Sequence, residues 1–531
     1  MSKQQTNHLL VEINEVAQAS IHLDELSGYI FQHELVRRLL VQDEHRLLSL
    51  NRFEKDEKEG RQASFSAVIY NYRTGISLLV TGQNDNPAAL TVTESNRQPE
   101  PTHEEFEAAV RIVTHQNQQL TTLLKANKAR LFKPMPPTLD EQQPDGHIER
   151  VVCVGIKSFS REIRSQIVGV NMVSRTVSVI ERNRFTDHVF DLSGDCGIDY
   201  AQQPTTQKGT AGQYNLVIKH PITQQEIWRM VVVRPAASSG TKGSGIELQQ
   251  VFYKGKKVLY RAHVPILNVR YDNDACGPYR DWQYEESNFE AIGTDVAPGV
   301  RLCSASPKTI FQSGNDNTGN FRGVAIYNSG TEVQLISEME AGWYRYISEW
   351  RFRLDGTILP RFGFSAVKNH CVCNVHHHHA YWRLDFDIET AGGNRVEEFN
   401  SPILVGSTNW HTKKFEIRRA KDASRNRKWK VSNVASGRGY ELLPGANDGS
   451  LDSYGVGDVW VLRYRGNELD DHVTSVGGTP EMCKAHLDNF LTGEAIDNTD
   501  VVLWYGAHFT HDVHHESVGH IVGPTLKPVN W

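Results

Sequence analysis

The stretch Asn374–Asp387 reads NVHHHHAYWRLDFD, in which four consecutive histidines lead into an aromatic and apolar run. Side chains alternate between the two faces of a β-strand, so a strand here would place His376 and His378 on one face and His377 and His379 on the other. Two imidazoles on one strand face can reach a single metal ion, and imidazole suits copper, zinc, iron and nickel. The alternative is a run of solvated histidines. The strand-like flanks favour a metal site.

Composition and charge argue against several classes of partner. The 531 residues carry a formal net charge of −6, so no basic field favours nucleic acid. No apolar run reaches the roughly 18 residues of a membrane span, and the first residues lack the layout of a secretion signal. Seven cysteines are few for this length. We therefore expect mostly reduced thiols in a cytoplasmic protein with no nucleic-acid or membrane partner.

Sequence patterns divide the chain into three parts. Residues 1–60 carry apolar positions at helical spacing, then a short strand-like run, and predict a helical or α+β segment. The charged run 54–61 is interpreted as a solvated connection. Residues 61–140 predict a small α/β domain with a hairpin, helices and a proline-rich end. Residues 148–531 are mostly short strands. The fold class is therefore mainly β, a large antiparallel β-sandwich preceded by small α/β domains.

A second histidine-rich segment lies near the C-terminus. Residues 500–516 begin as a buried-looking strand and continue into a histidine-rich loop. This segment can supply the third ligand that a strand with two histidines lacks. Spacing alone leaves His508, His511, His514 and His515 as alternatives.

These stretches resemble the copper amine oxidases, a family that contains a quinone cofactor. The family has a His-x-His pair seven residues before an Arg-Leu-Asp, as His376 and His378 stand before Arg383-Leu384-Asp385. Its third copper histidine follows a stretch similar to Asp500–Trp504 and closes a Thr-His pair, here Thr510-His511. The resemblance implies that His376, His378 and His511 bind copper.

The family makes its quinone, topaquinone, from a tyrosine beside the copper. Its signature resembles Thr-x-x-Asn-Tyr-(Asp/Glu)-Tyr, and the matching run here is 339–346, with Tyr344 at the precursor position. Trp343 replaces the asparagine that orients the quinone, and Arg345 replaces the acid. Tyr271 matches the family's tyrosine that hydrogen-bonds the quinone. The resemblance implies that Tyr344 is the quinone precursor, although two signature positions around it differ.

The family also uses a carboxylate as a general base that takes a proton from the substrate. Alignment on Trp282-Gln283 places Ser287 at this position, and a serine without a partner base cannot do this near neutral pH. Counting from flanking motifs gives Glu285 or Glu286 instead. Either glutamate suits the role if burial raises its pKa, and we favour Glu286. The alternative is that both are surface carboxylates.

A second metal site is implied by the resemblance. The family's peripheral calcium-type site has its counterparts here in Asp385, Asp387 and Asp500. Three carboxylates suit a hard cation such as Ca²⁺. We expect a cation bound at this site to have a structural role.

Two cysteines, Cys371 and Cys373, stand just before the histidine run. A Cys-x-Cys pair with a nearby histidine can bind a soft metal such as Cu(I), but we expect buried thiols. The disulfide of the family's catalytic domain has no visible counterpart, because Cys303 finds no partner in the region where one is expected.

The resemblance implies an enzyme that converts a primary amine, O₂ and water into an aldehyde, ammonia and hydrogen peroxide. It also implies a homodimer, and a similarity of residues 61–130 to the small domain that precedes the family's catalytic sandwich. The altered positions all belong to the quinone half of the mechanism, whereas the copper positions are intact. This asymmetry leaves two alternatives: a quinone-free copper oxidase or oxygenase acting on another substrate, and a copper-binding protein without enzymatic activity.

Overall fold

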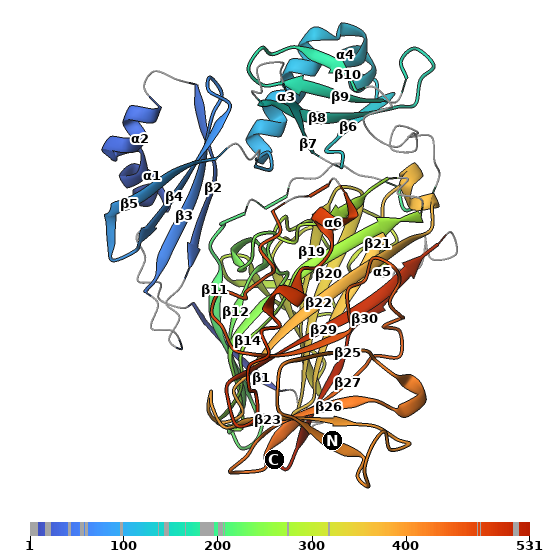
Figure 1. Cartoon of the computed structure of the whole chain (residues 1–531). Coiled ribbons are helices and arrows are strands. Elements are labelled where there is room, and N and C mark those ends of the chain that lie inside the picture. The colour runs from blue at the N-terminus through green and yellow to red at the C-terminus, as the bar shows by residue number, and fades with distance from the viewer. Residues whose placement is uncertain are drawn as a thin grey trace, which may run out of the picture.

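The structure is a computed structural model with two small units beside one large β-sandwich (Figure 1). It describes residues 9–15, 23–40, 44–53, 58, 62–95, 99–135, 137–142, 148–164, 166–180, 196–199, 205–206, 208–272, 276–316, 319–474, 476–477, 479–512 and 520–531. Within this part of the chain, no helix is long and apolar enough to cross a membrane.

The first small unit is a four-stranded sheet with two helices on one face. Its strands pair in the order β2 (His45–Phe53), β3 (Ser64–Asn71), β4 (Ile76–Gln83) and β5 (Asn86–Ser95), and its helices are α1 (Leu23–Gln32) and α2 (Glu34–Leu39). Alternating apolar residues of β3, such as Phe65 and Ile69, bury against Leu26 and Ile30 of α1. Because β2 pairs with β3, the sheet crosses the predicted boundary between residues 60 and 61.

The second small unit packs two helices on a five-stranded sheet. Its elements are α3 (His103–Gln116), α4 (Gln118–Lys125), β6 (Ala129–Phe132), β7 (Thr138–Gln142), β8 (Ile148–Ser158), β9 (Gln166–Asn171) and β10 (Val177–Val179). Thr102 caps α3, because its hydroxyl oxygen accepts a hydrogen bond from the Glu105 amide at 3.2 Å. β8 pairs with β6, β7 and β9, so this unit extends past the predicted start of the sandwich at residue 148. The sequence of a short strand does not show which sheet the strand will join. The predicted boundary at residue 148 therefore differs from the edge of this sheet.

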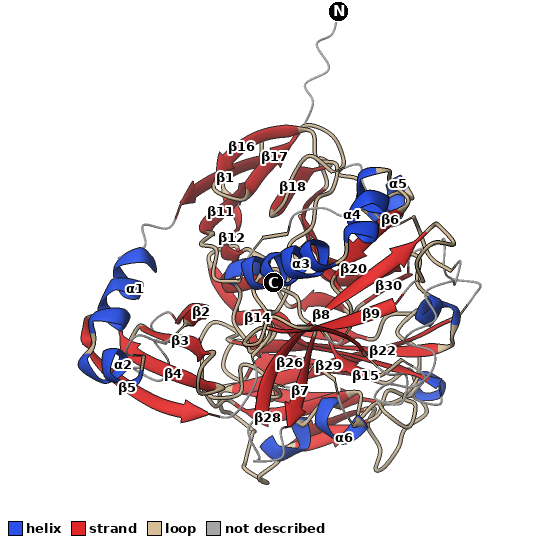
Figure 2. Cartoon of the chain, turned by 90° about the horizontal axis from the view of Figure 1, so that it is seen from above, coloured by secondary structure: helices blue, strands red, loops and turns tan. Residues whose placement is uncertain are grey.

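The sandwich consists of two large, mostly antiparallel sheets, which confirms the predicted mainly β fold (Figures 1 and 2). Among the described residues, the first sheet has ten strands: β1 (Leu10–Glu15), β11 (Gln213–Lys219), β12 (Glu226–Val233), β13 (Glu247–Tyr253), β14 (Lys256–Tyr271), β22 (His376–Phe386), β29 (Val501–His511), β28 (Val459–Arg463) and β25 (Ile417–Arg419) in this order, with β15 (Pro278–Arg280) on β14.

The second sheet has twelve strands within the described ranges. They are β16 (Gly293–Ala297), β17 (Val300–Cys303), β18 (Val324–Asn328), β19 (Glu332–Ala341), β20 (Tyr344–Arg353), β21 (Ile358–Ala366), β31 (Thr525–Val529), β27 (Gly439–Leu443), β26 (Lys428–Asn433), β23 (Asn394–Phe399) and β24 (Trp410–Lys413) in this order, with β30 (His520–Val522) on β21. Short helices in the loops are η3 (Pro235–Ala237), α5 (Ile310–Ser313), η5 (His370–Cys373), η6 (Ala423–Arg425), α6 (Pro480–Cys483) and η7 (Leu487–Phe490).

The first strand of the chain departs from the prediction. Residues 10–15, which have helical spacing, form β1 at the edge of the first large sheet, where Leu10 lies opposite Lys219 and Glu15 opposite Tyr214. Long-range pairing with β11 outweighs the weak local preference for a helix. The N-terminal segment therefore contributes to the sandwich and not only to the first small unit.

The central strand β22 positions the histidine run. It lies between β14 and β29, so that His376 faces Tyr271 on one neighbour and His511 on the other. All its residues except His377 are buried. A central strand with ordered neighbours on both sides holds its side chains in fixed directions, which is the condition for a preformed metal site.

Candidate metal centre

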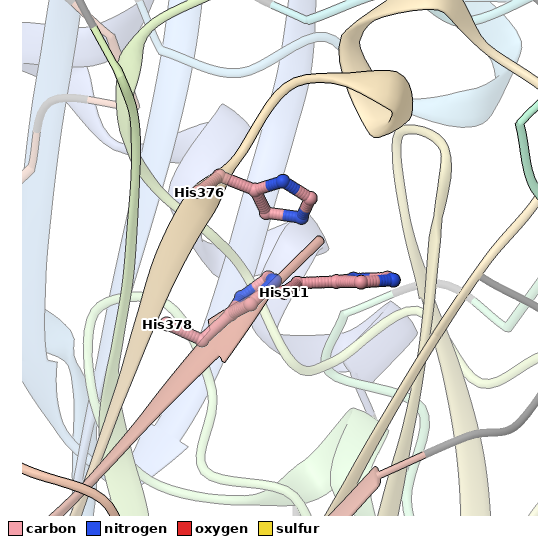
Figure 3. Close-up of side chains that lie close together, drawn as sticks. All are labelled: His376, His378 and His511. Atoms are coloured by element: carbon pink, nitrogen blue, oxygen red, sulfur yellow. The ribbon is translucent and has the colours of Figure 1, made fainter. Parts of the chain in front are cut away.

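Three histidines from two adjacent strands converge inside the sandwich (Figure 3). His376 and His378 project from β22, and His511 ends β29 directly opposite His376. One ring nitrogen of each lies within 4.8 Å of the others, and all three side chains are buried. The three histidines therefore lie close together in space, as the sequence predicts.

The hydrogen bonding of these rings fits a metal ion. His376 Nδ1 lies 2.6 Å from the carbonyl oxygen of Asn374, so it donates there and leaves Nε2 as the electron-pair donor. Neither ring nitrogen of His378 has a hydrogen-bond partner among the described residues, although the side chain is fully buried. A buried, unpartnered polar group is costly, and a bound metal ion would satisfy it.

Burial keeps these imidazoles neutral. It lowers the pKa of both His376 and His378 well below the usual histidine value, and repulsion between neighbouring histidines adds to this. Neutral imidazole is the form that binds a metal. Three neutral nitrogen ligands are a donor set that suits Cu²⁺.

Tyr344 places its hydroxyl among the three histidines. It comes from β20 in the facing sheet, and its oxygen contacts His376 Nε2 and lies 3.2 Å from His511 Nδ1. Its ring meets His378 edge-on, with ring centroids 4.6 Å apart. The tyrosine that the motif assigns as quinone precursor therefore contacts His376 and His511, two of the three converging imidazoles.

Aromatic residues enclose this tyrosine. Tyr271 stacks on His376 with centroids 4.5 Å apart, and its hydroxyl accepts a hydrogen bond from Trp343 Nε1 at 2.8 Å. Burial raises the pKa of the Tyr271 phenol, and its hydrogen bonds with Trp343 and Tyr344 oppose that rise. Trp343, in the position of the family's asparagine, thus fixes Tyr271 beside Tyr344.

The two glutamates proposed as the base point to other partners. Glu286 forms an ion pair with Arg234, whose Nε lies 2.9 Å from Glu286 Oε1, and also accepts from the Ala236 amide. Glu285 is paired with Lys133 at 2.6 Å. Of the polar contacts described for these two carboxylates, none is with Tyr344 or the three histidines.

Asp281 is a carboxylate at the site that the sequence prediction missed. It occupies the variable position of Arg280-Asp281-Trp282-Gln283, is fully buried, and accepts a hydrogen bond from the Tyr346 hydroxyl at Oδ2. Its other oxygen, Oδ1, has no hydrogen-bond partner in the described ranges. Burial raises the pKa of Asp281 to about 7, although the hydrogen bond from Tyr346 acts to lower this pKa. In the sequence, the only feature that pointed to Asp281 was its acidic side chain at the variable position of the Arg-x-Trp-Gln match.

The remaining histidines lie away from the triad or outside the described residues. His508 and His379 face the other side of β22 and β29, with their Nδ1 atoms 2.7 Å apart, and His508 Nε2 lies 2.9 Å from Asp458 Oδ1. His514 and His515 lie outside the described residues. Of the two alternatives for the third ligand that the structure describes, His508 and His511, it is His511 that lies beside His376 and His378.

The three aspartates of the expected calcium-type site also meet, but with a lysine among them. Asp385, Asp387 and Asp500 bring carboxylate oxygens within 4.8 Å of one another. Lys58 Nζ lies 2.6, 2.6 and 3.0 Å from one oxygen of each, respectively. Burial alone would lower the pKa of the Lys58 ammonium, but the three carboxylates raise it above its ordinary value, so the lysine is charged.

Two disulfides contradict the expectation of reduced thiols at the histidine run. Cys373 is bonded to Cys196 and Cys371 to Cys276, across 177 and 95 residues of sequence. Neither cysteine is therefore a free thiol or a Cu(I) ligand. Strand pairing of β14 with β22 brings the loops at their ends together, which spacing along the chain does not reveal. Cys303 is a buried free thiol, as are Cys153 and Cys483.

Replacing Cys276 and Cys371 together with serine should weaken metal retention, because η5, which contains Cys371, leads directly into His376. We expect copper loss on dialysis against a chelator to become roughly tenfold faster, the scale typical of groups that support a ligand. Copper per chain is measured by elemental analysis. The variant Cys303→Ser is the matched control, and equal retention in all three proteins would contradict the expectation.

Comparison with known proteins agrees with this geometry. Residues 360–531 match the family model described as copper amine oxidase, enzyme domain. The chain is 26% identical over 279 residues to the copper-containing amine oxidase gamma 2 of Arabidopsis thaliana, and 25% identical over 281 residues to gamma 1 of the same plant. The matches cover 39% and 40% of this chain and only 39% and 38% of those relatives.

Solved structures show the same fold over nearly the whole chain. A copper-containing benzylamine oxidase from Hansenula polymorpha superposes with a TM-score of 0.57 at 12% identity, covering 96% of this chain and 97% of that one. The amine oxidase of Aspergillus nidulans gives a TM-score of 0.55 at 13% identity, covering 100% and 89%. The matched enzyme domain contains both strands that carry the three histidines. Residues 360–531 thus match the enzyme domain of the copper amine oxidases, and the relatives and the shared fold support a divergent member of that family.

Proposed function

We propose that the protein is a copper-dependent amine oxidase, which converts a primary amine, O₂ and water into an aldehyde, ammonia and hydrogen peroxide. The observation that carries this proposal is the contact of the Tyr344 hydroxyl with His376 and its 3.2 Å approach to His511. Copper held by the three histidines would supply the redox chemistry for oxidation of Tyr344 to a quinone, whose carbonyl chemistry acts on amines.

The residues around Tyr344 hold it in one place. The triad fixes its hydroxyl, and Tyr346 stacks on its ring with centroids 5.3 Å apart and an interplanar angle of 6°. Trp343 holds Tyr271 on the adjoining side. All four aromatic side chains are buried, which keeps bulk water away from the reacting ring.

Asp281 is the carboxylate that we assign as the general base. Tyr344 and Tyr346 lie on the same face of β20, and Asp281 accepts from the Tyr346 hydroxyl, so its carboxylate is on the side of the strand where the chemistry takes place. Its unpartnered Oδ1 is available to take the proton from the carbon next to the substrate nitrogen. A pKa of about 7 suits a base that works near neutral pH.

The homodimer expected from the family is also a proposal. The loop between β23 and β24 exposes three consecutive apolar side chains, Ile403, Leu404 and Val405. An exposed apolar cluster of this kind suits burial against a second copy. Light scattering on the intact chain measures the mass directly.

The function is tested by oxygen uptake with a panel of primary amines, such as benzylamine, 2-phenylethylamine and 1,4-diaminobutane. Copper-loaded, aerated protein should release hydrogen peroxide and aldehyde in equal amounts. The matched control Tyr344→Phe keeps all three histidines and should bind copper without turnover. Turnover that persists in Tyr344→Phe would contradict the quinone mechanism and favour the quinone-free copper oxidase. Copper binding without turnover of any amine in the unmodified protein would contradict the proposed activity.

A further inference from the structure

Lys58 fills the centre of the acidic cluster at the far end of the histidine strand. Its ammonium contacts Asp385, Asp387 and Asp500 at 2.6 to 3.0 Å, and only 8% of its side chain is exposed. It also lies over two aromatic rings, 4.6 Å from the centroid of Tyr260 and 4.3 Å from that of Tyr464. It donates hydrogen bonds to Asp385 and Asp500, and the Asp387 carboxylate and the two aromatic faces add further favourable contacts to the ammonium.

This arrangement does not fit a bound calcium ion. Ca²⁺ takes six to eight oxygen ligands at about 2.3–2.6 Å, and the space among the three carboxylates is already occupied by the Lys58 nitrogen. Further positive charge comes from Lys257, 3.8 Å from Asp387, and Arg383, 3.4 Å from Asp385. The chain itself therefore balances the three aspartates.

We propose that Lys58 is the resident cation of this site, in place of a divalent metal ion, and that it fastens the first small unit to the sandwich. Lys58 lies between β2 and β3 of the first unit, Asp385 and Asp387 lie at the end of β22, and Asp500 directly precedes β29. The lysine thus joins the two strands whose other ends carry His376, His378 and His511. This inference does not depend on amine oxidase activity.

Terbium(III) luminescence tests the proposal, because tyrosine rings this close to the site sensitise a bound terbium ion. We expect no saturable signal from the full, unmodified chain and no calcium above background after dialysis. Lys58→Met removes the ammonium and keeps much of the side-chain volume. It should bind terbium at least tenfold more tightly than the unmodified chain, and calcium should compete for the site.

Two further variants make the result specific. Lys257→Met removes a positive charge at the rim and leaves Lys58 in place, so it should behave like the unmodified chain. Lys58→Met combined with Asp387→Asn should lose the terbium signal. Equal terbium affinity in the unmodified chain and Lys58→Met would overturn the proposal, as would one tightly held calcium per unmodified chain. If Lys58→Met does not fold, the terbium and calcium measurements on the unmodified chain still decide whether the site binds a metal ion. Lys58→Arg keeps the positive charge and should remain free of calcium.

Discussion

Replacing Asp281 with asparagine should slow substrate oxidation by about 10²–10⁴-fold, the usual contribution of a general base. The carboxamide has nearly the same shape and still accepts from Tyr346, so quinone formation should survive, as measured by titration with phenylhydrazine. The rate of anaerobic reduction by a primary amine isolates the proton-transfer step. With an α-deuterated amine, the isotope effect should show that this step limits the rate in the variant.

The pH profile of the same reaction separates a base from a structural residue. A carboxylate is the active form, so the rate of the unmodified protein should rise with pH through about 7, the raised pKa of Asp281. Besides Tyr346, the charged groups that act on Asp281 are Glu100, which raises its pKa, and Arg280, which lowers it. Tyr346→Phe removes a hydrogen bond that lowers this pKa, so the rise should move to higher pH. In Asp281→Asn the rise should vanish.

The matched control for Asp281→Asn is Glu285→Gln. It also removes one carboxylate, but this carboxylate is paired with Lys133, whereas Asp281 is hydrogen-bonded to Tyr346. Its rate and pH profile should stay close to those of the unmodified protein. An Asp281→Asn variant with an unchanged rate and profile would contradict the assignment, and a loss confined to Glu285→Gln or Glu286→Gln would restore the base favoured from sequence.

Replacing His378 with alanine should abolish turnover, because the site then retains only two of its three imidazoles. We expect copper affinity to fall by more than the roughly 100-fold seen for loss of a supporting group. Copper per chain and the competition with a chelator of known affinity measure the loss. Without copper, Tyr344 should remain an unmodified tyrosine, which peptide mass spectrometry detects.

His379→Ala is the control for this variant. His379 is the next residue on the same strand, but its side chain lies on the opposite face, against His508. Its removal should leave copper content and quinone yield close to normal, provided circular dichroism shows an intact fold. If the two variants lost copper equally, the effect would come from disturbance of β22 and not from loss of a ligand.

The sequence predicted the parts of the site that depend on local pattern. Strand alternation placed His376 and His378 on one face, and the family's spacing selected His511 from four histidines. Tyr344 followed from its own short motif. These residues lie on regular strands in fixed register, so their positions along the chain translate directly into positions in space.

The parts that sequence did not predict depend on burial and on distant partners. Asp281 stands at a variable motif position, and its burial and its hydrogen bond from Tyr346 are what lead us to propose it as the base. Lys58 lies in a charged run that we interpreted as a solvated connection, yet its side chain is 8% exposed between three aspartates. The partners of Cys371 and Cys373 lie 95 and 177 residues away. The cytoplasmic location, which rested partly on reduced thiols, loses that support and stays a prediction.

The most direct test of the central claim is a visible absorption spectrum of the copper-loaded, aerated protein before and after addition of phenylhydrazine. A quinone formed from Tyr344 should give a broad visible band that converts to an intense hydrazone band, with the adduct mapping to the peptide that contains Tyr344. The spectrum of Tyr344→Phe should show neither. Confirmed copper with no band and no adduct in the unmodified protein would contradict the account and leave a copper enzyme without a quinone.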